Sequence, residues 1–365
     1  MSLVLENLSY ELNGVTRIHD VNLTLKSGIF NVLLGKKGSV NTGKTTLMRL
    51  IAGLETPSKG RILMNGVDLV NIPVQKRNVS MVHHQFINYT HLTVRENIAS
   101  PLRVLGLKKS EIEHKVNEIA TLLHIESYLE RYPLELSGGQ QQRTAMARAL
   151  VKDADILLLD EPLVNLDYKL REELRTEIRE LLVARNCIAI YATTNPKIAM
   201  VLGGKSILMR KGRVIQEGLA VDVYNQPANI EAAKISSDPE INLIDGCIED
   251  NEIIFAQLLR FPLSSPLDDL IPGNYCFGIR PSHLKMTPTE DSDLELSMRV
   301  DLAEISGSET MIRISNSHFN IVMHLAGIHK YQTDTQIKIY IPIQKFFVFD
   351  KNGLLIKLPT LPYQN

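Results

Sequence analysis

The sequence predicts a protein of two domains, in which an α/β core with a parallel sheet is followed by a small all-β domain. Three observations support this prediction. Short apolar runs alternate with segments of helical periodicity over residues 1 to about 235. A glycine-rich loop joins an apolar run to a leucine-rich helical segment near residue 40. From about residue 241 the chain changes to short alternating segments separated by Gly, Pro and Asp.

Length and composition fit this division and narrow the classes of partner. The 365 residues exceed what one core usually holds, which favours two domains. The formal net charge of −1 provides no basic field for nucleic acid, so we expect no nucleic-acid partner. Cys187, Cys247 and Cys276 have neither metal-ligand spacing nor the pattern of a disulfide framework, which fits a reducing cytosol. No signal peptide and no apolar run of about 18 residues is evident, so action at a membrane would need docking on another protein.

The core has apolar strands and amphipathic helices in alternation. "NVLLG" (31–35), "ILLLDEP" (156–162) and "CIAIYATT" (187–194) are predicted to contain buried parallel strands. Residues 108–132 and 167–182 repeat their apolar positions at helical spacing. We therefore expect a parallel sheet with an inserted helical subdomain at about 88–150. The segments "ETMIRIS", "FNIVMHL", "QIKIYIPI" and "FFVFD" predict a barrel or sandwich beyond residue 241.

The glycine-rich loop fits the pattern G-x-x-x-x-G-K-[ST] from Gly38 to Thr45. The backbone N–H groups of such a loop surround phosphates, its lysine reaches the β- and γ-phosphates, and its hydroxyl residue ligates Mg²⁺. The following helix N-terminus also favours an anion. The sequence therefore predicts a site for ATP and Mg²⁺. The residues expected to bind the nucleotide are Gly38, Ser39, Asn41, Thr42, Gly43, Lys44, Thr45 and Thr46.

Two acidic residues end the apolar strand "ILLLD". Asp160 is placed to hold the magnesium ion through water, so Thr45 and Asp160 are the predicted metal residues. Glu161 is the predicted general base that polarises an attacking water. A strand that merely ends in two acids is the competing interpretation, which the glycine-rich loop disfavours.

A second anion cradle lies in "LSGGQQQRTAMARAL". Ser137, Gly138 and Gly139 precede a helix that begins near Gln140, and an exposed helix N-terminus attracts phosphate. Two cradles on one chain are explained by a head-to-tail dimer. Each nucleotide would then lie between the lysine loop of one chain and Ser137, Gly138, Gly139 and Gln140 of the other.

These motifs, in this order, resemble the nucleotide-binding domain of ATP-binding cassette (ABC) transporters, a P-loop NTPase core. "LSGGQQQR" and "DEPLVNLD" are highly specific for this family. "PAN", "NL", "GIRP" and the closing β segments resemble the OB-like regulatory domain of maltose-transporter-type ATPases. The resemblance implies a nucleotide-binding domain over 1–235 and a regulatory domain over 241–365. "FINYTHLTVRENIASPL" and "YATTNP" look most like one of the paired ATPases of glycerol and polyol importers.

The resemblance implies a function and a set of partners. The chain is expected to hydrolyse ATP to drive import of a polyol or sugar, such as glycerol or glycerol phosphate, at the cytoplasmic face of a bacterial inner membrane. Expected partners are two transmembrane permease subunits, a second ABC ATPase subunit and, indirectly, a solute-binding protein. A heterodimer of ATPases is favoured and a homodimer is the alternative. Residues 83–101 are expected to line a groove that faces the permease.

The sequence departs from the family pattern in the elements that act on its own nucleotide. "LLG" ends at Gly35, three residues before the loop pattern begins, so the extra residues either loop out or distort the cradle. The position of the Q-loop glutamine, which links magnesium and water to the permease, falls on His84, with Gln85 one step later. A metal site at the paired histidines is the alternative there, although no third ligand is evident.

The switch region and the adenine contact also differ. Thr194 stands where the family carries a histidine that contacts the γ-phosphate, and a threonine cannot act as a protonated imidazole. The adenine-stacking position falls near Leu12, which leaves Tyr10 as a weak candidate. We therefore expect weak hydrolysis at this chain's own site. A mainly regulatory subunit that completes its partner's site is the second hypothesis. A soluble ABC ATPase of DNA repair or translation is disfavoured, because no coiled-coil insertion is present.

Overall fold

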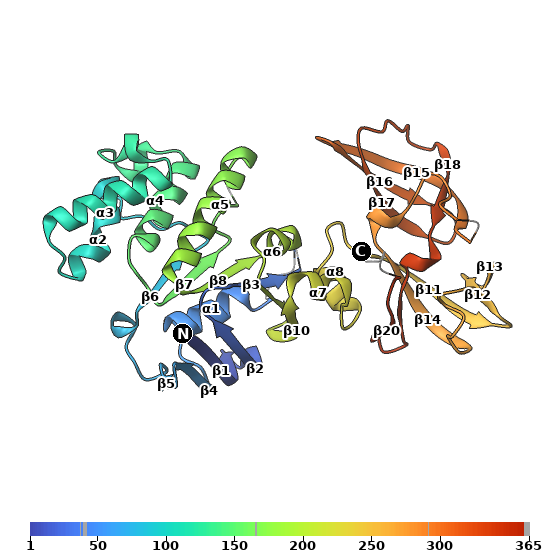
Figure 1. The fold of residues 1–365 in the computed structure, drawn as a ribbon, viewed down its shortest axis with the longest axis horizontal. Coiled ribbons are helices and arrows are strands. Elements are labelled where there is room, and N and C mark those ends of the chain that lie inside the picture. Colours follow the sequence, from blue (N-terminus) through green and yellow to red (C-terminus); the bar gives the residue numbers. More distant parts are fainter. Residues whose placement is uncertain (37, 39–41, 165, 291, 361–365) are drawn as a thin grey trace. The chain divides into compact units, whose positions relative to one another are not determined.

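The computed structural model describes residues 1–365 except 37, 39–41, 165, 291 and 361–365 (Figure 1). The chain divides into two compact units, Met1–Ala220 and Val221–Asn365. The boundary that we expected at 235–241 therefore lies inside the second unit. Helix α8 (Ile230–Ile235) explains this, because Ala233 is buried in a cluster with Phe347 and Phe349. Helix α7 (Ala220–Asn225) precedes it.

The first unit is built on a six-stranded sheet of order β10-β9-β3-β8-β7-β6. Its strands pair in parallel except for β10, which confirms the predicted parallel core. The strands are β3 (Phe30–Gly35), β6 (Val79–Val82), β7 (Ile156–Asp160), β8 (Ile188–Thr193), β9 (Lys205–Arg210) and β10 (Arg213–Leu219).

Both faces of this sheet are covered, which explains why its strands are apolar without alternation. Leu158 and Ile190 face helix α1 (Lys44–Ala52) in one core cluster. Leu159 and Tyr191 face the other cluster, whose helices include α5 (Tyr168–Arg185) and α6 (Pro196–Leu202).

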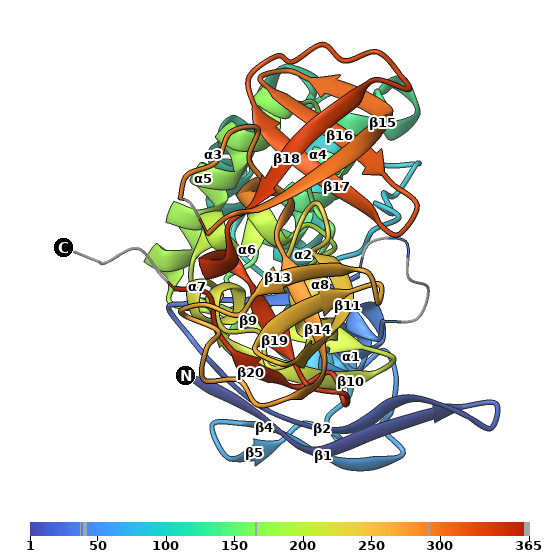
Figure 2. The ribbon, with the colours of Figure 1, turned by 90° about the vertical axis from the view of Figure 1, so that its right-hand side faces the viewer.

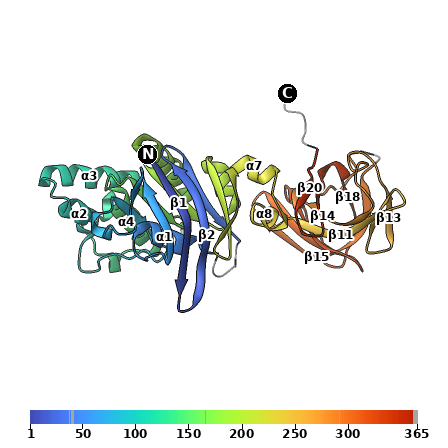
Figure 3. The same cartoon turned by 90° about the horizontal axis from the view of Figure 1, so that it is seen from below.

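A second, antiparallel sheet covers the far side of α1, and the sequence did not lead us to expect it. Its order is β2-β1-β4-β5, and its core residues share the cluster that contains α1. Figure 3 shows the long β1–β2 hairpin beside α1. The strands are β1 (Ser2–Leu12), β2 (Val15–Lys26), β4 (Lys59–Met64) and β5 (Val67–Asp68), and the short helix η1 (Val74–Lys76) follows them.

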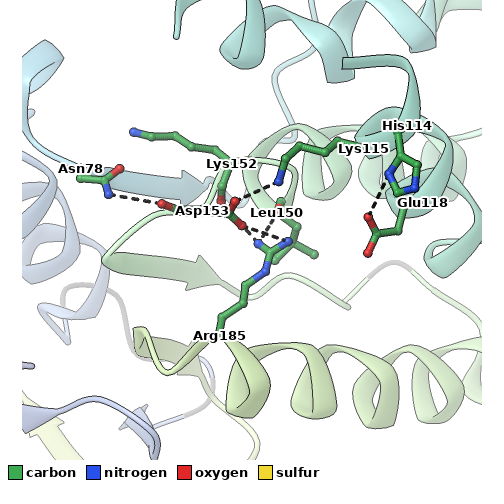
Figure 4. A network of polar contacts seen from close by, with 8 residues as sticks. All are labelled: Asn78, His114, Lys115, Glu118, Leu150, Lys152, Asp153 and Arg185. Carbon is green, nitrogen blue, oxygen red and sulfur yellow. Dashed lines mark hydrogen bonds and ion pairs between the residues drawn. The ribbon is translucent and has the colours of Figure 1, made fainter. Parts of the chain in front are cut away.

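A helical subdomain is inserted between β6 and β7, within the range expected for it. Its elements are α2 (Val94–Val104), α3 (Lys109–Leu122), η2 (Glu126–Tyr128), η3 (Pro133–Glu135) and α4 (Gly138–Leu150). A polar network joins α3 and α5 at the turn after α4 (Figure 4). There the Asp153 carboxylate lies 2.9 Å from Lys115 Nζ and 3.6 Å from Arg185 Nη2. Arg185 also donates to the carbonyl groups of Leu150 and Lys152.

The second unit confirms the predicted all-β domain, OB-like in class (Figure 2). Its two antiparallel sheets have the orders β13-β12-β11-β14-β19-β20 and β17-β16-β15-β18. One core cluster draws on both sheets, and within it the rings of Phe255 and Phe277 meet edge to face at 5.2 Å. The elements are β11 (Asn242–Glu249), β12 (Glu252–Phe255), β13 (Leu259–Pro262), β14 (Gly273–Ile279), η4 (Pro281–His283), β15 (Leu294–Ser306), β16 (Glu309–Ser315), β17 (Asn320–Ala326), β18 (Gln336–Ile341), η5 (Ile343–Lys345), β19 (Phe347–Phe349) and β20 (Leu355–Lys357).

Candidate nucleotide site

The residues predicted for magnesium and catalysis gather at one edge of the parallel sheet. Leu34 of β3 pairs with Thr193 of β8, and Asp160 of β7 pairs with Ala192 of β8. Strand β6 ends beside β7 and leads into His83 and His84. Because the carboxyl ends of parallel strands share an edge, the residues that follow β3, β6, β7 and β8 lie close together. Helix α1 begins at the same edge, after the glycine-rich loop.

The end of the glycine-rich loop is held tightly. Gly43 has φ +99°, and a Cβ there would lie 2.9 Å from the Cα of Gly212, so no other residue fits without movement. The Gly212 N–H donates to the Thr42 carbonyl oxygen at 3.0 Å, which ties the loop to the β9–β10 turn. Sequence reasoning missed this role of Gly212. The predicted residues Ser39 and Asn41 lie outside the described residues, whereas Gly38 is described and has φ +73°.

Lys44 is buried at the first position of α1, with 6% of its surface exposed. A Cβ on Gly35 would lie 3.1 Å from its Nζ, so the ammonium group lies against the end of β3. Burial lowers the pKa of Lys44, and the nearby carboxylates of Glu161 and Asp160 act in the opposite direction. A buried cation at the start of a helix, beside a glycine-rich loop, is a suitable partner for phosphate oxygens.

Thr45, Asp160 and His84 meet at a single carboxylate oxygen. Thr45 Oγ1 donates to Asp160 Oδ2 at 2.8 Å, and His84 Nδ1 lies 3.5 Å from the same oxygen. Asp160 is 2% exposed. A buried carboxylate with a hydroxyl group beside it is a donor set that suits Mg²⁺. Thr45 and Asp160 therefore fit the predicted magnesium site, which the phosphates of a nucleotide would complete.

Glu161 occupies a special backbone conformation next to Lys44. Its φ is 48°, unusual for a residue other than glycine, and such strain is often found at functional sites. Burial raises the pKa of the Glu161 carboxyl, and the charge of Lys44, the Thr194 backbone N–H and the Thr193 hydroxyl act against this rise. Thr193 Oγ1 donates to Glu161 Oε2 at 3.3 Å. We had not predicted a role for Thr193, and its position as the last residue of a strand beside β3 was the available signal.

The N-terminus of α4 presents the second predicted cradle on the surface. Ser137 and Gly138 are exposed, whereas Gly139 and Gln140 are partly exposed. Ser137 N–H donates to Gln140 Oε1 at 2.9 Å, and Gln140 N–H donates to Ser137 Oγ at 3.4 Å, which forms a capping box. A Cβ on Gly138 would meet no atom within 4 Å, so open space lies in front of the helix.

A buried side chain connects the two cradles. Gln142 of α4 is fully buried, and its amide donates to the carbonyl of Pro162, the residue after Glu161. The start of α4 is therefore fixed to the chain that carries the predicted base. No local pattern indicated this link, because Gln142 is one of three consecutive glutamines.

The structure does not support the predicted adenine contact of Tyr10 or the alternative of a metal site at the paired histidines. Tyr10 is 7% exposed, and its hydroxyl donates to Glu55 at 2.7 Å. Its burial in the core does not fit the adenine-stacking role that we predicted for it. Leu12, at the end of the same strand, is 45% exposed. Among the described residues, no group of three or more His, Cys, Asp and Glu side chains is placed to hold a metal ion, so the alternative of a metal site made by the histidine pair lacks a third ligand of these types.

Comparison with known proteins agrees with these motifs. Residues 18–164 match the profile of the family described as ABC transporter. The chain is 34% identical to the uncharacterized ABC transporter ATP-binding protein YcjV of Escherichia coli. The 343 aligned residues cover 93% of this chain and 94% of that protein. It is 32% identical to the sn-glycerol-3-phosphate import ATP-binding protein UgpC of Brucella abortus, over 96% of this chain and 98% of that protein. The sn-glycerol-3-phosphate import ATP-binding protein UgpC of Paraburkholderia xenovorans is also 32% identical, over 91% of this chain and 92% of that protein.

Solved structures agree at the level of the first unit. The dimeric ABC transporter cassette MJ0796 has a TM-score of 0.55 and 25% identity, covering 60% of this chain and 98% of that chain. The same values hold for its dimer in a post-hydrolysis state bound to ADP and Pi. Within the described residues, every helix is too short or too polar to serve as a membrane span.

Proposed function

Because the chain belongs to the family of ABC transporter ATP-binding proteins and is an ABC-type ATPase, we propose that it energises import of sn-glycerol-3-phosphate or a related polyol or sugar. The observation that carries this proposal is the similarity to the two UgpC proteins, which extends over more than nine-tenths of each chain. Such a subunit would work from the cytoplasmic face of the membrane with two permease subunits and a solute-binding protein.

The residues at the sheet edge would each have a separate role in ATP hydrolysis. Lys44 binds phosphate oxygens with its buried ammonium group. Thr45 and Asp160 would hold Mg²⁺, which neutralises part of the phosphate charge when it is bound. Glu161 accepts a proton from the attacking water, and its orientation is fixed by Thr193 and the Thr194 N–H. Ser137 and the glycines at the start of α4 would close over the nucleotide of a second cassette.

The segment 83–101 would contact the permease. Ile87 and Tyr89 expose 59% and 46% of their surface, although both are apolar or aromatic. The loop is nevertheless well fixed, because the buried amide of Asn97 bonds the backbone of Tyr89 in both directions at 2.8 and 3.0 Å. Asn88 Nδ2 also donates to the Gln141 carbonyl of α4 at 2.8 Å. Movement of the loop would therefore be transmitted to the start of α4.

Crosslinking tests this docking surface. Ile87→Cys should crosslink to the cytoplasmic loops of the permease in the assembled complex. Val183→Cys on α5 is the matched control, since Val183 is 52% exposed and lies outside the segment. Equal crosslinking from both positions would contradict the assignment of the surface.

An uptake measurement tests the proposed function. The chain is purified with its permeases, placed in proteoliposomes and supplied with ATP inside and the binding protein outside. We expect uptake of labelled sn-glycerol-3-phosphate or a related polyol, and loss of uptake with Lys44→Ala. ATP-dependent uptake of an unrelated solute class would reject the substrate, and an absence of any ATP-dependent uptake would reject the importer.

A second candidate is a subunit with a weak site of its own that completes the strong site of a different ATPase. The observation in its favour is Thr194, which offers Glu161 a backbone N–H at the position where the family carries an imidazole. Such a chain would form a heterodimer with an intact cassette. Copurification followed by mass spectrometry tests this: a second, distinct ATP-binding subunit supports it, and a complex that holds two copies of this chain contradicts it.

A further inference from the structure

We propose that His84 Nδ1 is a direct ligand of the divalent cation that accompanies the nucleotide, so that this site prefers Mn²⁺ or Co²⁺ to Mg²⁺ more strongly than a site with oxygen ligands alone. The proposal rests on the proposed function, because it assumes that a metal–nucleotide complex binds at this edge of the sheet.

The geometry carries the proposal. His84 Nδ1 and Thr45 Oγ1 approach the same oxygen, Asp160 Oδ2, at 3.5 and 2.8 Å. These atoms come from the ends of β6 and β7 and from the start of α1, three elements that are packed together in the core. A hydroxyl oxygen, a buried carboxylate oxygen and an imidazole nitrogen therefore converge where the phosphates would arrive. The phosphate oxygens would supply the remaining ligands.

The His84 side chain is free to turn towards a bound cation, whereas the Nδ1 atom of His83 is already in use. The side chain of His84 is 47% exposed, so a small rotation towards a cation meets little resistance. His83 instead uses its Nδ1 to accept the Gln85 N–H at 3.3 Å. The two rings are 4.3 Å apart with an interplanar angle of 31°, so His83 supports one face of the His84 ring. This makes His83 a close control for a histidine that is near the site without ligating.

The chemistry gives the proposal a measurable consequence. Mg²⁺ strongly prefers oxygen ligands, whereas imidazole binds the later divalent metals more tightly, in the order Mn²⁺ < Co²⁺ < Ni²⁺. A glutamine at position 84 would offer an amide oxygen to the same ion and would remove this preference. We expect the ratio of nucleotide affinity with Mn²⁺ to that with Mg²⁺ to fall on the order of tenfold in His84→Gln.

Electron spin echo measurements on bound Mn²⁺ test the ligation itself. The full chain is labelled with ¹⁵N-histidine and loaded with Mn²⁺ and a non-hydrolysable ATP analogue. A coordinated imidazole gives a strong ¹⁵N coupling, which adenine and lysine nitrogens cannot imitate because they carry ¹⁴N. We expect this coupling in the wild-type chain and in His83→Gln, and its loss in His84→Gln. Thermal melting of both variants establishes that they are folded.

The outcomes separate this proposal from the proposed function. A histidine coupling that disappears only in His84→Gln supports the ligation. If the Mn²⁺–nucleotide complex binds without any histidine coupling, or with a coupling that survives in His84→Gln, the ligation is wrong and the proposed function stands. If no metal–nucleotide complex binds to the chain, alone or with its permeases, both proposals fail.

Discussion

The edge of the parallel sheet and the N-terminus of α4 are the two places that we propose to bind phosphate, but they differ in burial and in how their polar groups are used. At the sheet edge, Lys44 and Asp160 are almost fully buried, and the polar groups bond one another. At the start of α4, Ser137 and Gly138 are exposed, and the capping box is closed within four residues. The first region would therefore bind its ligand among buried groups of this chain, whereas the second would present an exposed helix N-terminus to a ligand held by another chain.

This difference shows where substitutions can accumulate. Residues of the sheet edge would act on this chain's own nucleotide, and there His84 and Thr194 stand where the family resemblance implies a glutamine and a histidine. The start of α4 would act on the nucleotide of the partner, and its sequence keeps the full family pattern. Gln142 joins the two regions through the Pro162 carbonyl, so a change at one site can reach the other.

The largest effect is expected from a bulky cation at the start of α4. Ser137→Arg should abolish ATP turnover and transport by the assembled complex, because the new side chain would fill the open space in front of the helix. Ser137→Ala is the control: it loses the cap, at a cost of about 1 kcal/mol in stability, but adds no bulk. Reduced but measurable turnover in Ser137→Ala, together with none in Ser137→Arg, is the expected result. Equal losses would mean that the cap alone matters.

The next largest effect should follow from restoring an imidazole at the sheet edge. Thr194→His should raise single-turnover hydrolysis at this chain's own site by roughly tenfold, since a positioned proton-transfer group contributes at least that much. Thr194→Ser keeps the hydroxyl and the backbone N–H, and should leave the rate unchanged. The measurement is a single turnover of labelled ATP in a complex whose partner site is inactivated. No gain in Thr194→His, with nucleotide binding intact, would show that Thr194 does not limit this site.

A smaller effect is expected from Glu161→Gln in the intact complex. If this chain's own site is slow already, losing its general base should lower transport only a few-fold. Glu161→Asp shortens the side chain and keeps the charge, and serves as a control for the bonds from Thr193 and Thr194. Transport by Glu161→Gln is then compared with transport by Ser137→Arg. If the two variants lose transport to the same extent, the two nucleotide sites contribute equally to ATP turnover.

Local patterns predicted which residues would lie together better than they predicted the surroundings of those residues. Lys44, Thr45, Asp160 and Glu161, which the structure brings together at the sheet edge, each stand at a fixed offset from a strand or helix end. The contacts of Gly212 and Gln142 depend on segments distant in sequence, which no local pattern encodes. Tyr10 was misjudged for a related reason: alternation places it on one face of β1, but only the packing of α1 against that face makes it a core residue.

The smallest effect is expected at the opposite end of α4, where the polar network of Figure 4 joins the helical subdomain to α5. The Asp153 side chain is 65% exposed, so its pairs with Lys115 and Arg185 are screened by solvent. Asp153→Ala should lower the free energy of unfolding by less than about 1 kcal/mol. Its backbone carbonyl would still accept the Asn78 amide, at 3.2 Å in the wild type.

Arg185→Ala provides the contrast at the same place. It removes the ion pair with Asp153 and also the donors to the Leu150 and Lys152 carbonyls. The Lys152 carbonyl still accepts the Ala154 N–H at 2.9 Å, so the group that loses its donor is the Leu150 carbonyl at the end of α4. We expect a cost of about 1–2 kcal/mol, since an unpaired carbonyl group is more costly than a lost surface ion pair. Denaturant unfolding of the two variants measures the difference. If Asp153→Ala proves as costly as Arg185→Ala, the charge pairs and not the carbonyl contacts hold this end of the helix, and α4 is fixed by charge at one end and by hydrogen bonds at the other.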